Sequence, residues 1–297
     1  MKILVTGSTG FLGSHLMLHL RDRGHRVGCL VRDSSTLQPE PSNLPTWRVG
    51  VNGSGFREAL ADFTPDVVVH LAALYVVEHR YENVGPLVQA NVEFGTYLLD
   101  AMGAAGCDAL VYAGTSWQHY RNRDYCPVNL YAATKQAFST LAEYYLDAAD
   151  LRLLELHLYD SYGEDDPRSK LVNRLKAAAL SGNELAVSDG DQRLHLVHVA
   201  DIVRGMAMAC EQVCAFKAGE RRIYRLPSAK AVSLRELVAA WNAADPSRQV
   251  RVRWSSRPYR PREVFQPWEG AEILPGWRAD ISLMEGLRRV RHGIGWG

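Results

Sequence analysis

The sequence Thr6-Gly7-Ser8-Thr9-Gly10-Phe11-Leu12-Gly13 joins an apolar run at residues 3–5 to an amphipathic stretch at residues 11–23. We expect the run to be a strand and the stretch to be a helix. Glycines let the backbone approach a ligand closely, and the unpaired N–H groups at a helix N-terminus attract anions. The spacing G-x-x-G-x-x-G is one residue longer at the front than the usual dinucleotide fingerprint. The stretch therefore predicts a turn that binds the pyrophosphate of a dinucleotide.

Short apolar runs alternate with helical stretches through the first half of the chain. Strands are expected at residues 27–31, 47–49, 66–71, 109–113 and 152–158, and helices at 88–104 and 130–147. This order is typical of parallel strands that are connected by helices on both faces of a sheet. It predicts an α/β fold, a Rossmann-type doubly wound parallel sheet.

Beyond residue 163 the pattern becomes irregular. A basic helix is expected at residues 170–181, and prolines gather between residues 258 and 275. We therefore expect residues 1–163 to form the dinucleotide-binding domain, with a return segment near residues 192–215. Residues 164–297 are expected to form mainly a smaller C-terminal substrate-binding lobe.

The composition excludes several classes of protein. The 34 basic and 33 acidic residues give a net charge of +1, which offers no general field for nucleic acid or an anionic membrane. No run of about 18 apolar residues occurs, and the chain enters its first strand without a signal-peptide pattern. The five scattered cysteines lack the partners of a metal site. The sequence predicts a cytoplasmic protein that binds no metal, nucleic acid or membrane.

The end of the second strand selects between the two nicotinamide dinucleotides. An NAD site places an acidic residue there to hold the ribose hydroxyls, whereas a 2′-phosphate requires an arginine. Here Val31 stands at that position, and Arg32 follows it. We therefore expect NADPH, with Arg32 at its 2′-phosphate. NAD is the alternative, because a shift of one residue would bring Asp33 to the ribose.

A tyrosine and a lysine, Tyr131 and Lys135, stand four residues apart on one face of the helix expected at residues 130–147. A free tyrosine with a pKa of about 10 is a poor acid–base group at neutral pH, but a nearby ammonium lowers that pKa. Thr115 and Ser116 follow the strand at 109–113. Because ligands of open α/β sheets bind at the carboxyl ends of the strands, we expect these hydroxyls at the same site.

Together these segments resemble the extended short-chain dehydrogenase/reductases, the NAD-dependent epimerase/dehydratase family, whose members act mostly on nucleotide sugars. The resemblance covers essentially the whole chain. It rests on the glycine turn, the Ser/Tyr/Lys set, Asn91 and three further stretches: His70-Leu71-Ala72-Ala73, Leu158-Tyr159-Asp160-Ser161-Tyr162-Gly163 and residues 274–287.

The resemblance implies roles for individual residues. Ser116 and Tyr131 would hydrogen-bond a carbonyl oxygen, Tyr131 would donate the proton, and Lys135 would bind the nicotinamide ribose. Ser116 lies four residues before Tyr120, as the catalytic hydroxyl does in relatives, and Thr115 is the alternative. The implied cofactor contacts are Gly7, Thr9, Gly10, Phe11, Leu12, Gly13, Arg32, Leu71, Ala72, Ala73, Tyr131 and Lys135.

The loop after residue 114 is most similar to the CDP-paratose/CDP-abequose synthase branch, which contains nucleotide-sugar 4-ketoreductases of deoxysugar biosynthesis. Dehydratases of the family carry Asp-Glu directly after the catalytic hydroxyl, where this chain has Trp117 and Gln118, so dehydration is disfavoured. The implied reaction is NADPH-dependent reduction of the 4-keto group of a nucleotide-linked deoxyhexose. The expected substrate contacts are Trp117, Gln118, His119, Tyr159, Asp160, Lys170, Arg260 and Arg262.

An epimerase that retains NAD is the main alternative, because epimerases need only the Ser/Tyr/Lys set and a tightly held cofactor. Arg32 argues against that alternative. A non-catalytic NADP-binding regulator is a third interpretation, which the intact Ser/Tyr/Lys set disfavours. A homodimer is expected through the helices at residues 88–104 and 130–147, a frequent arrangement of this fold.

Overall fold

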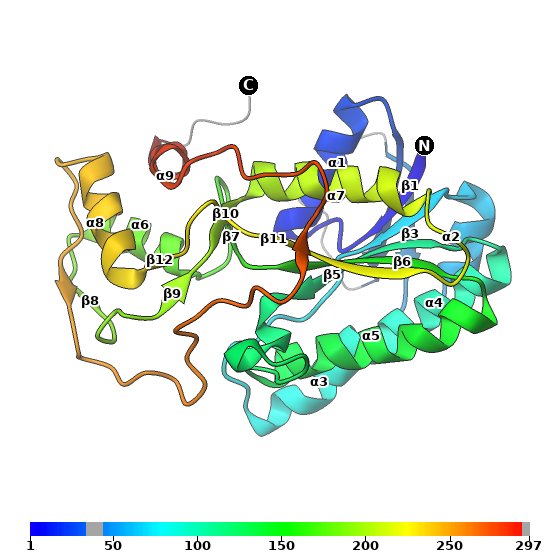
Figure 1. Cartoon of the computed structure of the whole chain (residues 1–297). Coiled ribbons are helices and arrows are strands. Elements are labelled where there is room, and N and C mark those ends of the chain that lie inside the picture. Colours follow the sequence, from blue (N-terminus) through cyan, green and yellow to red (C-terminus); the bar gives the residue numbers. More distant parts are fainter. Residues whose placement is uncertain (34–43, 293–297) are drawn as a thin grey trace.

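The computed structural model describes residues 1–33 and 44–292, and one sheet of eight parallel strands forms its centre (Figure 1). The strands run in the order β14-β11-β6-β5-β4-β1-β2-β3. Their bounds are β1 Lys2–Thr6, β2 Arg26–Arg32, β3 Thr46–Val49, β4 Val67–His70, β5 Ala109–Thr115, β6 Arg152–Leu158, β11 Arg221–Leu226 and β14 Glu272–Ile273. The expected α/β fold with a doubly wound parallel sheet is confirmed.

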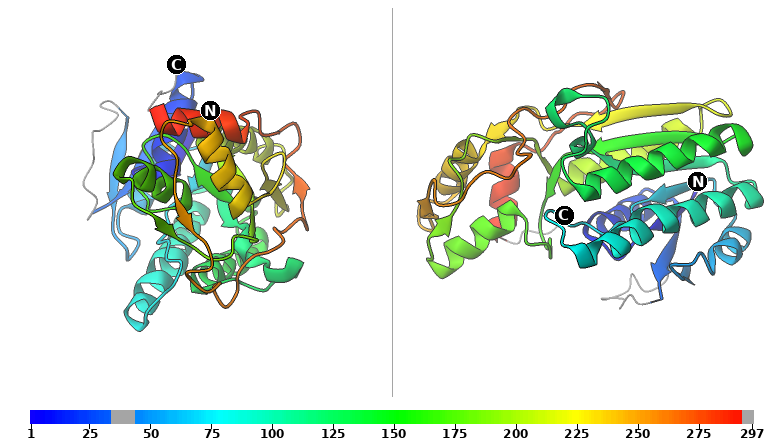
Figure 2. Two further views of the ribbon diagram at one scale, coloured as in Figure 1. Left: turned by 90° about the vertical axis from the view of Figure 1, so that its left-hand side faces the viewer. Right: turned by 90° about the horizontal axis from the view of Figure 1, so that it is seen from below.

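Helices cover both faces of this sheet (Figures 1 and 2). Successive side chains of a strand point to opposite faces, so Val67 and Val69 pack with helices α1 (Phe11–Asp22) and α7 (Val199–Val213). Val68 packs on the other face, where the helices are α2 (Phe56–Phe63), α4 (Phe94–Ala105) and α5 (Leu130–Ala148). Burial on both faces explains why the central strands are almost entirely apolar.

A smaller lobe packs around a separate hydrophobic cluster, with Trp241 buried in it. Its helices are α6 (Leu171–Ser181), α8 (Leu234–Ala244) and α9 (Leu283–His292). Its short strands are β8 Leu185–Ala186, β9 Arg193–Leu194, β12 Val232–Ser233 and β13 Val252–Arg253. The paired strands β7 (Asp160–Tyr162) and β10 (Leu196–His198) follow β6 and precede α7, so they connect the lobe to the carboxyl end of the sheet.

Segments from the C-terminal half of the chain return to the sheet. Helix α7 lies within the return segment expected near residues 192–215, and β11 and β14 extend the sheet beyond β6. Helix α2 and strand β11 were not expected from the sequence. Strand β11 lies near the edge of the sheet and carries Arg221, Arg222 and Arg225, so it lacks the apolar pattern of a central strand. The division of the chain at residue 163 stays a prediction.

The turn between β1 and α1 is closed by glycines. Gly7 has a φ of +69°, and a Cβ there would lie 2.6 Å from the backbone nitrogen of Ala72. A Cβ on Gly13 would lie 2.1 Å from the carbonyl oxygen of Gly7. Gly10 caps α1 without a side-chain hydrogen bond, so the first N–H groups of the helix are not taken by a capping side chain.

The described part of the chain has neither a membrane-spanning helix nor a cluster of metal ligands. Among residues 1–33 and 44–292, no helix is long and apolar enough to cross a membrane. In the same ranges, no three His, Cys, Asp or Glu side chains gather in a way that could hold a metal ion.

Candidate active site

Two adjoining cavities surround the glycine turn. The Arg32 cavity, of about 240 Å³, is lined by Thr9, Arg32 and Ala72 among others. The Tyr131 cavity, of about 210 Å³, is lined by Phe11, Leu12, Gly13, Tyr131 and Lys135 among others. Both cavities share four residues of the turn and of the loop after β4: Gly7, Gly10, Leu71 and Ala73. All twelve residues that we expect to hold the cofactor therefore line one cavity or both.

This arrangement fits a dinucleotide. The glycine turn is a cradle in which a side chain at Gly7 or Gly13 would collide with backbone. The N-terminus of α1 begins at Gly10, which lines both cavities, and its partial positive charge favours a phosphate there.

Thr6, at the end of β1, fastens the loop after β4 to the turn. Its Oγ1 accepts hydrogen bonds from the backbone N–H groups of Leu71 and Ala72, both at 3.1 Å, and lies 2.7 Å from His70 Nδ1. Because the hydroxyl accepts two bonds, it has its own proton to donate to His70. His70 is therefore neutral, and burial together with the charge of Lys135 lowers its pKa to about 3.

The 3₁₀ turn η3 (Ser116–Gln118) places Ser116 in the Tyr131 cavity. Thr115 lines the same cavity, but its Oγ1 accepts a hydrogen bond from the Trp117 N–H at 3.3 Å. The Ser116 hydroxyl has no partner among the described residues, so we keep Ser116 as the candidate for the catalytic hydroxyl.

Gln118 is fully buried. Its side chain accepts a hydrogen bond from the Thr115 N–H at 2.8 Å and donates one to Gln136 at 2.8 Å. Gln118 thus caps the turn and lines none of the three cavities, and its role as a substrate contact stays a prediction.

Helix α5 brings Tyr131 and Lys135 into the same cavity. Asn129 caps this helix: its Oδ1 accepts from the Ala132 N–H at 3.0 Å. Its Nδ2 donates to the carbonyl oxygen of Val77 at 2.9 Å. The first turn of α5 is thereby attached to the segment that follows β4.

The charge state of Tyr131 differs from our expectation. Burial raises the pKa of Tyr131 to about 12, and the cation that acts against this rise is Arg168, not Lys135. Burial also lowers the pKa of Lys135 to about 7, with Glu155 acting in the opposite direction. Lys135 therefore does not hold the pKa of Tyr131 down in this structure, and Tyr131 is a neutral phenol at pH 7.

A π-helical segment, η2 (Gln89–Glu93), lies between α3 (Val84–Val88) and α4. Such segments are frequent at functional sites. Buried Asn91 in this segment accepts from the Leu74 N–H at 2.7 Å and donates to Thr134 Oγ1 at 2.9 Å. Thr134 in turn donates to the carbonyl oxygen of Tyr131 at 2.8 Å. Asn91 is thus a positioning residue that connects the segment after β4 to α5. From the sequence, Asn91 was known only as one of the residues that carry the family resemblance.

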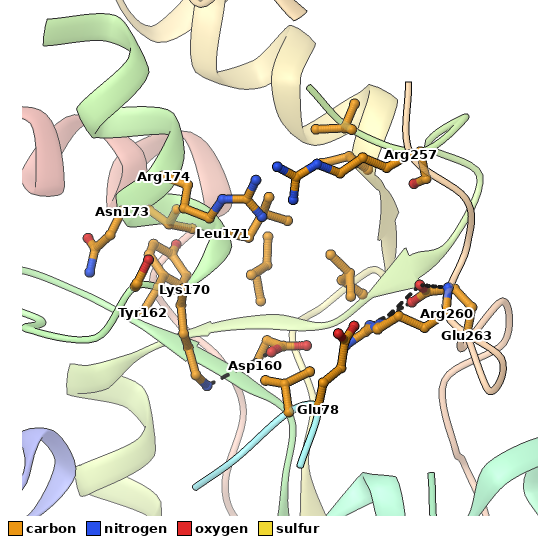
Figure 3. A pocket seen from close by; sticks show the side chains of 18 of the residues that line it. Glu78, Asp160, Tyr162, Lys170, Leu171, Asn173, Arg174, Arg257, Arg260 and Glu263 are labelled. Carbon is orange, nitrogen blue, oxygen red and sulfur yellow. Dashed lines mark hydrogen bonds and ion pairs between the residues drawn. The ribbon is translucent and has the colours of Figure 1, made fainter. Parts of the chain in front are cut away.

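A third and larger cavity, the Arg174 cavity of about 470 Å³, adjoins the Tyr131 cavity. The residues that line both are Tyr75, Trp117, Asp160, Ser161 and Lys170. Arg174 and Arg257 extend toward each other in this cavity (Figure 3). Neither guanidinium forms an ion pair with the described residues. Burial and the charge of Arg257 lower the pKa of Arg174. From the sequence, both arginines belong to basic clusters that could meet a diphosphate, but we selected Arg260 and Arg262 in their place.

Lys170 and Arg260 line the Arg174 cavity, as expected of substrate contacts, but each has a carboxylate partner (Figure 3). Arg260 forms a double contact with Glu263, at 2.7 and 3.1 Å. Lys170 Nζ lies 3.9 Å from Asp160. The unmatched positive charge on the wall of the cavity therefore belongs to the two other arginines.

Comparisons with known proteins bear on what this site does. Residues 3–224 match the NAD dependent epimerase/dehydratase family. The chain belongs to this family. It is 26% identical over 216 residues to the CDP-abequose synthase of Yersinia pseudotuberculosis, covering 69% of this chain and 72% of that protein. It is 27% identical to the UDP-glucose 4-epimerase of Corynebacterium glutamicum, covering 100% of this chain and 90% of that one. The UDP-glucose 4-epimerase of Thermus thermophilus, solved in complex with NAD, matches with a TM-score of 0.82, 26% identity and 98% coverage of both chains.

Three residues that the family resemblance placed at the substrate have protein partners instead. Arg262 donates to Cys126 Sγ at 2.9 Å, and His119 stacks on Trp268 with ring centres 3.9 Å apart. Neither lines any of the three cavities, and their roles as substrate contacts stay predictions. Tyr159 lines the Tyr131 cavity, but its hydroxyl donates to the carbonyl oxygen of Trp268.

The buried, neutral His70 makes stability depend on pH. The unfolded chain binds a proton at this position below about pH 6.5, whereas the folded protein does so only below about pH 3. The free energy of unfolding therefore falls as the pH drops through this window, by up to about 1.4 kcal/mol per pH unit. We expect the loss between about pH 6.5 and 4.5 to be about 2 kcal/mol smaller in His70→Gln than in the wild type. Urea unfolding across this range measures it, and equal losses in both proteins would show that His70 is not a buried neutral base.

Proposed function

We propose that the protein reduces the 4-keto group of a nucleotide-linked deoxyhexose, with NADPH as the hydride donor. The observation that carries the proposal is that Ser116, Tyr131 and Lys135 line one cavity between the glycine turn and the Arg174 cavity. The similarity to a CDP-abequose synthase supports the class of sugar. Trp117 supports reduction over dehydration, because it cannot exchange a proton at neutral pH.

In this proposal, Tyr131 donates the proton to the carbonyl oxygen and Ser116 donates a second hydrogen bond to it. The nicotinamide, when bound, supplies the hydride to the carbonyl carbon. A pKa raised to about 12 supports this role, because Tyr131 then carries the proton that reduction requires. The positive charge of Arg168, the cation that opposes the rise in the pKa of Tyr131, favours the phenolate that remains until solvent returns the proton.

The Arg32 cavity supports NADPH as the cofactor. Arg32 is exposed at the end of β2, and its guanidinium has no ion pair or hydrogen bond within the described part of the chain. No Asp or Glu of that part lines the cavity, so no carboxylate is placed to hold a 2′-hydroxyl or to repel a 2′-phosphate. Val31, where an NAD site has its acidic residue, is buried in the sheet.

The Arg174 cavity supports a nucleotide sugar as the substrate. Two unpaired guanidinium groups, Arg174 and Arg257, suit the two negative charges of a diphosphate. Tyr75 and Trp117 lie where this cavity meets the Tyr131 cavity, so a sugar carbonyl can reach Tyr131 while the diphosphate reaches the arginines.

An epimerase that retains NAD is the second candidate, which the NAD complex of the Thermus thermophilus relative favours. Epimerisation must begin by removing a proton from a sugar hydroxyl, and this step needs the phenolate form of Tyr131. No carboxylate of the described residues lines the Arg32 cavity, which supports a consumed NADPH and therefore reduction instead.

We also propose a homodimer through the helices that follow β4 and β5. Large apolar side chains are exposed there: Val88, Tyr97, Leu141 and Tyr144. Exposed apolar side chains on neighbouring helices can pack against a second copy of the chain. Sedimentation velocity of the purified protein measures its mass directly.

The substrate is tested with a panel of CDP-, TDP-, GDP- and UDP-linked 4-keto-deoxysugars and NADPH, followed by absorbance and by NMR of the product. We expect NADPH consumption with at least one sugar, and a loss of about 10²-fold or more in turnover for Tyr131→Phe, because the proton donor is gone. Cofactor binding should persist in that variant. Tyr125→Phe, an exposed change that lies outside the three cavities and the proposed dimer helices, serves as the control. Epimerisation without NADPH consumption would favour the second candidate.

The cofactor is tested with Arg32→Ala. Loss of a charge-assisted hydrogen bond should weaken NADPH binding by about 1.5–3 kcal/mol and leave NADH binding nearly unchanged. Arg26→Ala, at the other end of the same strand, is the matched control and should change neither affinity. Isothermal titration gives both affinities, and an equal loss for the two cofactors would contradict a 2′-phosphate contact.

The diphosphate site is tested with Arg174→Gln and Arg257→Gln. Each change removes one unpaired charge, so we expect KM for the nucleotide sugar to rise about 10- to 100-fold with a smaller change in kcat. Arg262→Gln removes a nearby arginine that lines none of the three cavities, and KM should stay near the wild-type value. A comparable rise in KM for Arg262→Gln would place the diphosphate elsewhere.

A further inference from the structure

A buried cluster of ionisable side chains lies behind Lys135 and lines none of the three cavities. Glu155 and His157 stand on β6, and His119 follows the turn that carries Ser116. Their exposed fractions are 0%, 1% and 7%. Buried ionisable groups are costly unless each is paired, so the protons of this cluster are constrained by its hydrogen bonds.

The first proton is fixed by a carbonyl group. His119 Nδ1 lies 3.1 Å from the carbonyl oxygen of Arg123, which can only accept, so Nδ1 carries a proton. Burial and the neighbouring His157 lower the pKa of His119 to about 4, so this ring is neutral and its Nε2 is an acceptor. His157 Nδ1 lies 3.0 Å from that acceptor and must donate to it.

The second proton lies between His157 and Glu155. His157 Nε2 is 3.4 Å from Glu155 Oε2, and without a proton there two acceptors would face each other in a buried site. Glu155 also accepts from Ser139 Oγ at 2.7 Å and from Arg221 Nε at 2.8 Å, and such bonds favour the carboxylate. Burial alone would raise the pKa of Glu155, but the bonds from His157, Arg221 and Ser139 outweigh it and hold the pKa below its usual value. The geometry therefore favours an imidazolium next to a carboxylate.

Glu155 lies beside Lys135 beneath α5. Tyr112 of β5 is the register partner of Glu155, and Lys135 Nζ lies 4.2 Å from the centre of the Tyr112 ring. Ser139, which donates to Glu155, follows Lys135 by one helical turn. The ammonium and the carboxylate therefore occupy neighbouring positions on one face of the sheet.

The titratable groups around Lys135 come from each element packed against it: His70 of β4, Tyr112 of β5, Glu155 of β6 and Tyr131 of α5 itself. His70 is neutral, and burial raises the pKa values of both tyrosines. Glu155 is the carboxylate in this set, and it opposes the effect of burial on Lys135.

We propose that Glu155 is a positioning residue that favours the ammonium form of Lys135, and that a protonated His157 keeps Glu155 ionised. The consequence for turnover rests on the proposed function, whereas the charge states do not. A negative charge near an ammonium favours its protonated form. Removing the charge of Glu155 must therefore lower the pH at which Lys135 loses its proton.

The test follows Lys135 directly by the ¹³Cε chemical shift of the protein labelled with ¹³C-lysine. The chain has six lysines, and the Lys135 signal is the one missing in Lys135→Met. We expect the titration midpoint of Lys135 to fall by about one pH unit or more in Glu155→Gln. An unchanged midpoint would overturn the proposal.

Glu143→Gln is the matched control. Glu143 also pairs with Arg221, and it stands on the same helix as Lys135, but its side chain is 54% exposed and outside the buried cluster. We expect the midpoint of Lys135 in this variant to equal that of the wild type. A fall as large as in Glu155→Gln would mean that Arg221, and not the buried carboxylate, is responsible.

A second measurement reads the protonation states of the two histidines in the wild-type protein. In ¹⁵N-histidine spectra of the wild type at about pH 7, we expect protons on both nitrogens of His157 and on Nδ1 alone of His119. His157→Asn and His119→Asn assign the signals. A singly protonated His157 would overturn the ion pair even if Glu155→Gln failed to fold.

Turnover separates this proposal from the proposed function. If a nucleotide sugar is reduced, the loss of kcat at high pH should begin at lower pH in Glu155→Gln than in the wild type and Glu143→Gln. Unmoved profiles in an active enzyme would refute the role of Glu155. A shifted Lys135 midpoint without reduction of any sugar would refute the proposed function and leave the role of Glu155 in place.

Discussion

The contact between Gly13 and the carbonyl oxygen of Gly7 is the constraint on which the candidate site depends. A Cβ at Gly13 would lie 2.1 Å from that oxygen, much closer than atoms pack in protein interiors. Because no side chain intervenes, the first turn of α1 lies directly over the end of β1. Gly7 makes a second close approach, to the backbone of Ala72, which brings the loop after β4 to the same point. Both cavities beside the turn follow from these two approaches.

Polar side chains extend this arrangement to the helix that carries the acid–base pair. Thr6 holds the loop after β4, Asn91 joins that loop to α5 through Thr134, and Asn129 joins the first turn of α5 to Val77. Each such hydrogen bond contributes only about 1 kcal/mol net, but leaving a buried partner unpaired costs more. Tyr131 is therefore positioned by the protein itself, before any ligand contributes, as electrostatic catalysis requires.

The parts of the fold and site that the sequence predicted are those determined by short-range pattern. A run such as Val67-Val68-Val69 indicates a strand buried on both faces, and it is one. The three glycines belong to one short loop and the start of the helix after it, and Tyr131 and Lys135 lie one helical turn apart. Residues so close in sequence reach the cavities together. Strand β11 was missed because it lacks an apolar pattern and because the buried partner of its Arg221 is far along the chain: Glu155, 66 residues away.

Contacts between residues that are far apart in the sequence also decide which charges are available to a ligand. Arg174 and Arg262 are equivalent as residue types, yet one is unpaired in a cavity and the other donates to Cys126, 136 residues away. No local pattern distinguishes them, because the distinction is made by how the lobe folds against the sheet. Charge placement at this site is thus a tertiary property. The spacing of residues in the sequence is enough to predict the chemistry near Tyr131. Predicting the substrate contacts also requires knowing which nearby charges are paired in the folded protein.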